Sequence, residues 1–360
     1  MGRVTKKTEK GKEIICAIDL HQKSMLAGVA VDKGEMSFKE YKNSEAGFKN
    51  LADRLDNLRE LNSSSEVWVA YEASGCGFLL ADYLENRGFR SFVLAPTHLP
   101  VTVKSRSNKT DKRDVIRIHE VLRGHVLAGN SLPAVWNPPR RVRDDRELIR
   151  RRLSLREQTS RVKNQVHGLL RRYGIKKPSW MKTNWSKQHL EWLYSLETVL
   201  DIGASRTLMS YLRELDYHQS ECRAIEKDML ELAGSDRYRK QVGRLTEIPG
   251  VGVLTAMVYL TELGDLSRFN NRKQVGSYLG LAPRSFESGE QNDRKGRISK
   301  MGPSRVRKVL NQAAWSLVRW DPYWNQWFKD RTPKGKNKRR MIVAVMRQLG
   351  IKMWHLAQAA

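Results

Sequence analysis

The chain has 360 residues, and its 66 Lys+Arg against 39 Asp+Glu give a formal net charge of +27. Hydrophobic residues make up 40% of the sequence, which excludes a chain disordered along its whole length and favours two or three domains. No apolar run approaches the roughly eighteen residues that a membrane span needs, and the three cysteines (Cys16, Cys76, Cys222) form no CxxC pair and no disulfide framework. These features indicate a cytoplasmic protein.

Residues 1–137 predict an α/β domain. Ile14–Leu20 is a short apolar run that contains a carboxylate near its end, and residues 25–31 have the pattern of its hairpin partner. Apolar residues at helical spacing predict a helix over Glu45–Leu61. The same criteria predict strands over 66–71 and 91–95 and helices over 78–86 and 110–127. Two strands followed by alternating strands and helices indicate a mixed sheet covered by helices.

Residues 138–236 predict a helical arm, beginning where Pro133, Pro138 and Pro139 break the earlier pattern. One helical seam consists of Leu148, Arg152, Leu155, Thr159, Val162, Val166 and Leu169. A second consists of Leu208, Leu212, Leu215, Cys222 and Met229. The spacing predicts an antiparallel coiled coil or a helical hairpin, with residues 174–185 as the connection. Residues 237–360 form a third unit, which is helical and rich in glycine.

Four carboxylates are the first candidate site. Asp19 and Glu72 each stand at the end of a predicted strand, and Asp111 and Asp114 are three residues apart near a helix start, on one face. Carboxylates that converge at a sheet edge repel one another unless cations neutralise them. Two Mg²⁺ ions held this way activate a nucleophile and stabilise the leaving oxygen at a phosphodiester. The alternative is that these are ordinary surface or helix-capping acids. Basic residues near the Asp pair favour nucleic-acid contact: Lys104, Arg106, Lys109, Lys112 and Arg113.

Glycines mark a second candidate site. Ile248-Pro249-Gly250-Val251-Gly252 precedes an apolar helical stretch and has the form of a helix-hairpin-helix turn. Gly250 and Gly252 would let backbone N–H groups approach a phosphate, which binds nucleic acid without reading its sequence. A simple glycine turn in a helical domain is the alternative.

A serine on a predicted loop is the third candidate. Ser288-Gly289 offers a small, exposed hydroxyl as a nucleophile, with Ser285 and Ser299 as rivals. Four nearby cations would hold a scissile phosphate: Arg284, Arg294, Lys295 and Arg297. Lys300 is a further expected nucleic-acid contact. A basic loop that only contacts DNA explains the same residues equally well. No P-loop is present and no histidine has HExxH spacing, although His21, two residues after Asp19, stands close enough in sequence to touch the acid site.

Six motifs occur together in one order along the chain. They are Ile18-Asp19-Leu20-His21, Tyr71-Glu72-Ala73-Ser74-Gly75, Lys109-Thr110-Asp111-Lys112-Arg113-Asp114, Ile248-Pro249-Gly250-Val251-Gly252, Gly280-Leu281-Ala282-Pro283, and Ser288-Gly289 with Gly296-Arg297-Ile298-Ser299-Lys300. Each is weak alone, but the ordered set resembles the DEDD-type transposases of bacterial insertion sequences, the bridge-RNA-guided serine recombinases. Val115 stands where this family has a small Ala, a departure that should not affect metal binding.

The resemblance implies a fold and a reaction. It implies an RNase H-like (RuvC-like) domain over 1–137 with Asp19, Glu72, Asp111 and Asp114 as metal ligands. It implies a coiled-coil oligomerisation arm over 138–236 and a helical transposase domain over 237–360 with Ser288 as nucleophile. The expected activity is RNA-guided DNA recombination through a phosphoserine intermediate with Mg²⁺. The expected partners are a structured bridge RNA, donor and target DNA, and copies of the same chain in dimers and tetramers.

Two other functions remain open from the residues themselves. A hydrolytic RuvC-like nuclease or Holliday-junction resolvase would use the four acids, with Ser288 as a DNA contact only. A non-catalytic nucleic-acid-binding protein would explain the charge but not the intact set of acids. The +27 charge agrees with all three functions, because each phosphate neutralised by Lys or Arg releases counterions.

Overall fold

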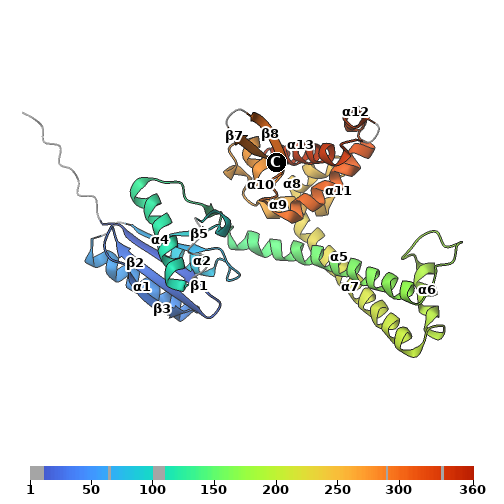
Figure 1. Cartoon of the computed structure of the whole chain (residues 1–360), viewed down its shortest axis with the longest axis horizontal. Helices are drawn as coiled ribbons and strands as arrows, with labels where there is room; N and C mark the ends of the chain where they lie inside the picture. The colour runs from blue at the N-terminus through green and yellow to red at the C-terminus, as the bar shows by residue number, and fades with distance from the viewer. Residues whose placement is uncertain (1–11, 64–65, 100–109, 289–290, 334–335) are drawn as a thin grey trace, which may run out of the picture. The chain divides into compact units, whose positions relative to one another are not determined.

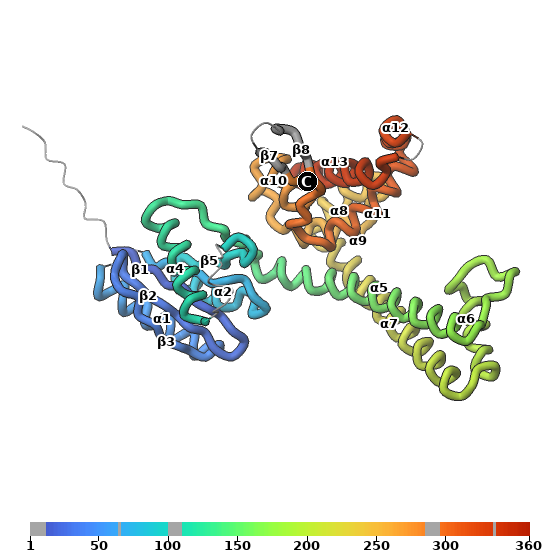
Figure 2. The backbone as a smooth tube through the Cα atoms, in the orientation of Figure 1, coloured from blue at the N-terminus to red at the C-terminus, as the bar shows by residue number. Residues whose placement is uncertain are grey.

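The computed structural model describes residues 12–63, 66–99, 110–288, 291–333 and 336–360, with the backbone alone for 285–288 and 291–295. By its internal contacts the chain divides into two compact units, Met1–Asn137 and Pro138–Ala360. Figures 1 and 2 show the elements of each unit in the same orientation. None of the helices in these described ranges is both long enough and apolar enough to span a membrane.

The first unit contains a six-stranded mixed sheet (Figure 1). Its strands are β1 (Ile14–Leu20), β2 (Ser24–Val31), β3 (Ser37–Lys42), β4 (Val67–Glu72), β5 (Arg90–Leu94) and β6 (Ala134–Val135). They lie in the order β3-β2-β1-β4-β5-β6. β1 pairs antiparallel with β2 and parallel with β4, and β4 pairs parallel with β5. The order 3-2-1-4-5 is that of an RNase H-like sheet.

Helices cover both faces of this sheet. α1 (Glu45–Leu61) and α2 (Leu79–Asn86) pack on one face, and α4 (Asp111–Ala128) packs on the other. Successive side chains of a strand point to opposite faces of the sheet, so the apolar residues of β1 contact helices on both sides. Ile14, Cys16 and Ile18 pack with the α1 and α2 side chains, whereas Ile15 and Ala17 pack with those of α4.

A glycine in β2 allows α4 to lie close to the sheet. A Cβ atom at Gly28 would come within 2.6 Å of Val115 Cγ1 and 2.5 Å of Met36 Sδ. Val115 is completely buried against the sheet. The valine therefore fills space that the absent side chain of Gly28 leaves free, and this contact fixes the first turns of α4, which carry two of the four acids.

Most elements predicted for this unit are confirmed, with ends that differ by no more than about one residue. β3 was not predicted. Its sequence, SFKEYK, carries three charged residues and is exposed at four of six positions, so it lacks the apolar alternation of a half-buried strand. A sheet edge tolerates such a sequence because only one side of the strand is paired.

Two long helices form the first part of the second unit (Figure 2). α5 (Arg140–Arg172) and α7 (Ile202–Gly234) pack along each other, and α6 (Lys187–Ser195) lies in the connection between them. Together they form a helical hairpin within one chain, as predicted, whereas the short helix α6 was not predicted. The seam contains Leu155, Val162, Val166 and Leu169 from α5 and Leu208, Leu212 and Leu215 from α7.

The predicted seam is wrong at its first position. Leu148 is only partly buried, and Ile149, which is 1% exposed, takes the buried place. Arg152 keeps its predicted place in the seam because its guanidinium meets Glu226 of α7 at 3.3 Å. An arginine in an apolar seam is tolerated when a carboxylate from the facing helix pairs with it.

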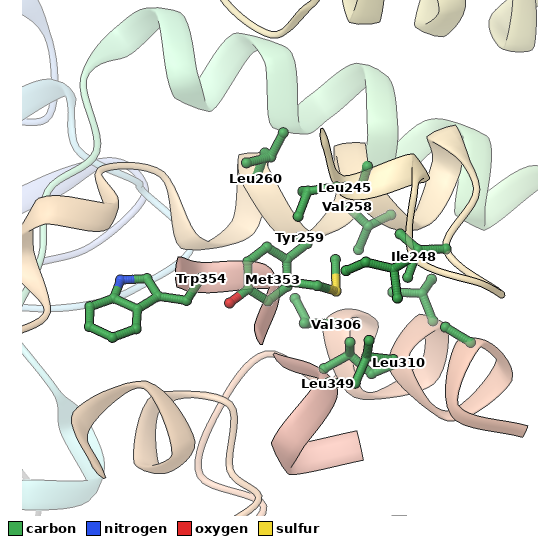
Figure 3. Close-up of a cluster of buried hydrophobic side chains, with 14 of the residues drawn as sticks. Leu245, Ile248, Val258, Tyr259, Leu260, Val306, Leu310, Leu349, Met353 and Trp354 are labelled. Atoms are coloured by element: carbon green, nitrogen blue, oxygen red, sulfur yellow. The ribbon is translucent and has the colours of Figure 1, made fainter. Parts of the chain in front are cut away.

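The rest of the second unit is largely helical. Its helices are α8 (Arg239–Thr246), α9 (Val253–Leu263), α10 (Arg272–Tyr278), α11 (Ser304–Trp320), α12 (Pro322–Arg331) and α13 (Lys338–Gln358). They enclose the core drawn in Figure 3, where Tyr259 of α9 lies beside Met353 of α13. The Tyr259 hydroxyl donates a 2.6 Å hydrogen bond to the Gly350 carbonyl, so its one polar atom is satisfied in the core.

Hydrogen bonds and an ion pair join the base of the hairpin to this core. Arg146 of α5 donates to the Thr261 carbonyl (2.5 Å) and the Glu262 carbonyl (2.9 Å) at the C-terminal end of α9. Arg150 makes two hydrogen bonds, of 2.8 and 3.0 Å, to the Glu262 carboxylate, whose side chain is 8% exposed. The partial negative charge of a helix C-terminus favours the two guanidinium groups at this position.

Replacing Arg150 should destabilise the second unit substantially. Arg150→Met leaves the Glu262 carboxylate buried without its partner, which costs about 3 kcal/mol of unfolding free energy. We expect a lower urea midpoint for the second unit, measured by tryptophan fluorescence. The double variant Arg150→Met/Glu262→Gln should recover part of the loss, because it removes the buried charge. Equal stability of Arg150→Met and the wild type would contradict this account of the joint.

Candidate active site

Two parallel strands place the first two acids next to each other. Asp19 follows Ala17 by two residues on β1, so its side chain lies on the face that α4 covers. Glu72 follows Ala70 by two residues on β4 and lies on the same face. Ile18 pairs with Tyr71 in the parallel register, so the next residues, Asp19 and Glu72, sit side by side at the carboxyl edge of the sheet.

The start of α4 brings the other two acids to this edge. Thr110 caps the helix by accepting a hydrogen bond from the Arg113 N–H, so the helix begins at Asp111. Asp114 lies one turn later and is mostly buried, with 15% of its side chain exposed, whereas Asp111 is 63% exposed. Four acids from three separate chain segments therefore meet in one place.

His21 connects Asp19 and Asp111. Its Nε2 atom lies 3.1 Å from Asp19 Oδ2 and 3.5 Å from Asp111 Oδ1. One ligand atom from each of the three residues falls within 4.8 Å of the others, a spacing that a metal ion could occupy. The Asn43 side chain donates a 2.8 Å hydrogen bond to the His21 carbonyl and fixes the chain just after β1.

Arg117 connects Glu72 and Asp114. Its Nη2 atom lies 3.0 Å from Glu72 Oε2 and 3.1 Å from Asp114 Oδ1, and the side chain is 21% exposed. The arginine follows Asp114 by three residues, so both project from the same side of α4. Each half of the acid set thus has its own basic residue.

The electrostatics of Asp19 fit a site for a cation. Burial raises the pKa of the Asp19 carboxyl; the neighbouring His21 opposes this shift, and the charges of Asp111 and Asp114 add to it. A carboxylate that is dehydrated and faces like charges gains from a divalent ion. The donor set of carboxylate oxygens, with one imidazole nitrogen nearby, suits Mg²⁺ or Mn²⁺, so these residues fit the metal that the sequence predicts.

Open space borders this cluster. A groove of about 650 Å³ lies beside His21 and is lined by Asn43, Ser74 and Gly75 among others. Lys112 and Arg113 are exposed on the first turn of α4. The predicted contacts Lys104, Arg106 and Lys109 lie outside the described residues.

The two glycines of the helix-hairpin-helix turn have different surroundings. Gly250 has φ +87°, and a Cβ atom there would lie 2.7 Å from the Ala313 carbonyl oxygen of α11. Glycine at this position therefore allows the turn to adopt a positive φ and to pack closely against α11. Gly252 is the N-cap residue of α9 and is exposed, and a Cβ atom there would meet nothing within 4 Å. Of the two, Gly252 has the freer approach for a phosphate.

The segment expected to be a loop around Ser288 is a β-hairpin, so that expectation was wrong. β7 (Pro283–Ser288) pairs with β8 (Gln291–Ile298), and Ser288 is the last residue of β7, opposite Gln291. Ser285 pairs with Lys295, and Phe286 pairs with Arg294. The side chains of 285–288 and 291–295 lie outside the description, so Ser288, Arg294 and Lys295 are placed by their backbone alone.

The remaining predicted contacts lie at the base of the hairpin. Arg284, Arg297 and Lys300 are exposed. Arg284 Nη2 lies 3.4 Å from the Ser299 carbonyl oxygen, and the Ser299 N–H donates to the Ala282 carbonyl. Ser299 is thus tied into the base of the hairpin, whereas Ser288 stands at the turn.

A basic groove is a further feature of the second unit. It has a volume of about 720 Å³ and is lined by residues of α5, α7 and α11. Its cationic side chains are Arg156, Arg161, Arg172 and Lys308. Glu157, the single acid in the lining, pairs with Lys308 at 2.7 Å.

Sequence patterns did not single out Arg117. An arginine three residues after an aspartate on a helix is common, and no pattern showed that Glu72 of a distant strand would lie within its reach. His21 had a usable signal, its place two residues after Asp19. The basic groove had none, because its cations come from separate helices.

Comparisons with known proteins agree with these features. A family model described as "Transposase IS116/IS110/IS902 family" matches residues 242–329, and a model of the IS110-type DEDD transposase domain matches residues 16–175. The second stretch contains all four acids, and the first contains the glycine turn and the β7–β8 hairpin.

Individual relatives extend the similarity over most of the chain. The transposase for insertion sequence element IS1533 of Leptospira borgpetersenii is 28% identical over 84% of this chain and 85% of its own length. The transposase y4qE of Sinorhizobium fredii is 29% identical over 76% of this chain and 63% of its own length. The pilin gene-inverting protein of Moraxella bovis is 36% identical over 29% of this chain and 33% of its own length. The two domain matches and these relatives show that the chain belongs to the IS110/IS116/IS902 family of transposases, which are DNA strand-transfer enzymes.

Proposed function

We propose that this transposase cleaves and rejoins DNA through a phosphoserine intermediate on Ser288, assisted by a divalent metal at Asp19, Glu72, Asp111 and Asp114 and directed by a structured bridge RNA. The observation that carries the proposal is the convergence of four acids from β1, β4 and α4 at one sheet edge. The resemblance to the bridge-RNA-guided recombinases supplies the serine and the RNA.

The proposed reaction conserves the number of phosphodiester-type bonds. The Ser288 hydroxyl oxygen attacks the scissile phosphorus, the new Oγ–P bond forms, and the P–O3′ bond breaks. The serine proton is lost and the departing 3′ oxygen gains one, so the DNA ends in a free 3′ hydroxyl. A 3′ hydroxyl from the partner strand then attacks the phosphoserine and releases Ser288. No ATP is needed, because the covalent intermediate stores the bond energy.

The residues of the acid cluster have separate tasks in this proposal. A bound divalent ion supplies Lewis-acid stabilisation of the charge that develops on the phosphate and the leaving oxygen. Asp19 and Asp111 would offer ligand oxygens to the ion, with His21 between them. Glu72 and Asp114 are held in place by Arg117. The exposed cations Arg284, Arg297 and Lys300 are proposed to contact nucleic acid near the serine.

The net charge and the family resemblance support two further parts of the proposal, the binding of a bridge RNA and the assembly of several copies of the chain. A net charge of +27 suits a protein that binds backbones and leaves sequence choice to base pairing. We propose that residues 138–236 serve as the oligomerisation arm and residues 237–360 as the transposase domain. The seam residues Leu155 and Val162 are already buried within one chain. Self-association in dimers and tetramers is therefore proposed to use other residues of the arm.

A reconstitution tests this function directly. The purified protein is combined with RNA transcribed from the DNA flanking its gene, donor and target DNA, and Mg²⁺. We expect recombinant product that depends on both the RNA and the metal. A nicked product without strand exchange, formed equally well without RNA, would instead support the hydrolytic nuclease or junction resolvase.

The basic groove between α5, α7 and α11 should contribute to nucleic-acid affinity. Arg161→Gln/Arg172→Gln removes two groove cations, and each lost phosphate contact reduces the slope of log K against log salt by about 0.9 on duplex DNA. We expect weaker binding and a flatter salt dependence in a fluorescence anisotropy titration. The matched control is Arg223→Gln/Lys227→Gln, which removes two exposed cations of α7 that do not line the groove. Identical slopes for both double variants would contradict a role for the groove.

A further inference from the structure

We infer that Arg117 supplies one of the positive charges that the acid cluster requires, so that the cluster holds a single divalent ion where the sequence pattern suggested two. This inference rests on the metal site of the proposed function and concerns how many ions that site takes. It follows from the way the basic residues divide the four acids.

Arg117 occupies the position between two of the acids. A single nitrogen, Nη2, contacts both Glu72 (3.0 Å) and Asp114 (3.1 Å). A second metal ion placed between Glu72 and Asp114 would meet the positively charged guanidinium of Arg117. Both acids already face a cation there.

Arg117 is held in this position by its contacts with both acids. Its Nε atom is buried and has no hydrogen-bond partner among the described residues. Moving the group aside would break its contacts with Glu72 and Asp114, and its side chain is already mostly buried. A second ion would therefore have to displace a buried charge at considerable cost.

The other half of the cluster is open to an ion. One ligand atom each from Asp19, His21 and Asp111 lies within 4.8 Å of the others. His21 is 51% exposed and Asp111 is 63% exposed, so both can adjust and water can reach them. The single ion is therefore expected on the Asp19–Asp111 side.

The charge count agrees with this arrangement. Four carboxylates carry four negative charges, which one divalent ion and one guanidinium reduce to a single net negative charge. A second divalent ion with Arg117 still in place would make the cluster positive before any substrate phosphate arrived. Arg117 thus acts as a positioning residue that holds Glu72 and Asp114 toward the ion.

Counting bound ions tests the inference without an activity measurement. The full-length protein is titrated with Mn²⁺ in the absence of nucleic acid, because phosphates bind the ion, and free Mn²⁺ is followed by electron paramagnetic resonance. The ions at the cluster are those lost when Asp19→Asn and Asp114→Asn are introduced together into the protein being titrated. We expect one such ion in the wild type and two in Arg117→Gln, with the second binding at least about tenfold more tightly than in the wild type.

Two further variants separate charge from structure. Arg117→Lys keeps the positive charge and should bind one ion, like the wild type. Arg59→Gln is the matched control, because Arg59 forms the same i, i+3 pair with Asp56 (2.7 Å) on α1, away from the cluster. It should also bind one ion. Circular dichroism confirms that each variant is folded; if Arg117→Gln is not, the number of ions in the wild type still tests the proposal.

The outcomes distinguish this inference from the proposed function. Two ions in the wild type, or one ion in both the wild type and a folded Arg117→Gln, would overturn the role of Arg117 while leaving the metal site intact. No ion that depends on Asp19 and Asp114 in the wild type would overturn the metal site itself, and with it both proposals.

Discussion

Replacing any one of the four acids with its amide should abolish strand exchange. The variants Asp19→Asn, Glu72→Gln, Asp111→Asn and Asp114→Asn each remove one negative charge from the proposed metal site. Metal stabilisation of a phosphodiester transition state is worth several kcal/mol, so the rate should fall by about a thousandfold or more. The measurement is the rate of recombinant product formation with RNA, both DNA substrates and Mg²⁺.

The matched control is an acid of the same domain outside the cluster. Asp53 is 40% exposed and pairs with Lys49 and Arg87, so Asp53→Asn should keep nearly full activity. RNA affinity should remain close to the wild-type value in all five variants. Normal recombination by any of the four cluster variants would remove that acid from the proposed metal site.

Stability in the absence of metal gives an independent view of the same residues. Asp19 is partly dehydrated and faces the charges of Asp111 and Asp114. At neutral pH in EDTA, Asp19→Asn removes this repulsion and weakens the contact with His21. The melting temperature of Asp19→Asn should equal or exceed that of the wild type. A clearly lower melting temperature would instead indicate that Asp19 stabilises the fold.

Ser288→Ala should eliminate the covalent step and leave binding unchanged. Loss of a nucleophilic hydroxyl typically costs an enzyme at least about a thousandfold in rate. We expect no protein–DNA adduct on a denaturing gel, while anisotropy shows wild-type affinity for RNA and DNA. The controls are Ser285→Ala and Ser299→Ala, which change the two rival hydroxyls and should both retain the adduct. An adduct that persists in Ser288→Ala would show that another residue is the nucleophile.

Regular elements of the first unit could be predicted because their patterns are local. β1 and β4 are largely continuous apolar runs. The apolar residues of α1 recur at helical spacing, and the helix ends at Asn62, whose backbone N–H bonds to the Leu58 carbonyl. β3 could not be predicted, because its stability comes from pairing with β2 rather than from its own exposed, charged sequence. The β7–β8 hairpin was missed for a similar reason, since its polar sequence was typical of a loop.

The four acids of the candidate site could be predicted from the sequence, but the way in which they pair with His21 and Arg117 could not. The positions of Asp19 and Glu72 at strand ends implied that the two would share a sheet edge. The division of the cluster into a pair joined by His21 and a pair joined by Arg117 depends on the parallel register of β1 with β4 and on how close α4 lies to Gly28. These are tertiary contacts, and residue spacing along one chain does not report them.

Mass spectrometry of a trapped protein–DNA intermediate tests the central claim most directly. A nicked donor strand, which cannot be rejoined, is incubated with the wild-type protein, RNA and Mg²⁺, then digested with trypsin and nuclease. The account predicts a deoxynucleotide on Ser288, absent in EDTA and in Asp19→Asn. A deoxynucleotide on Ser285 or Ser299, or cleaved DNA without any modified serine, would contradict it.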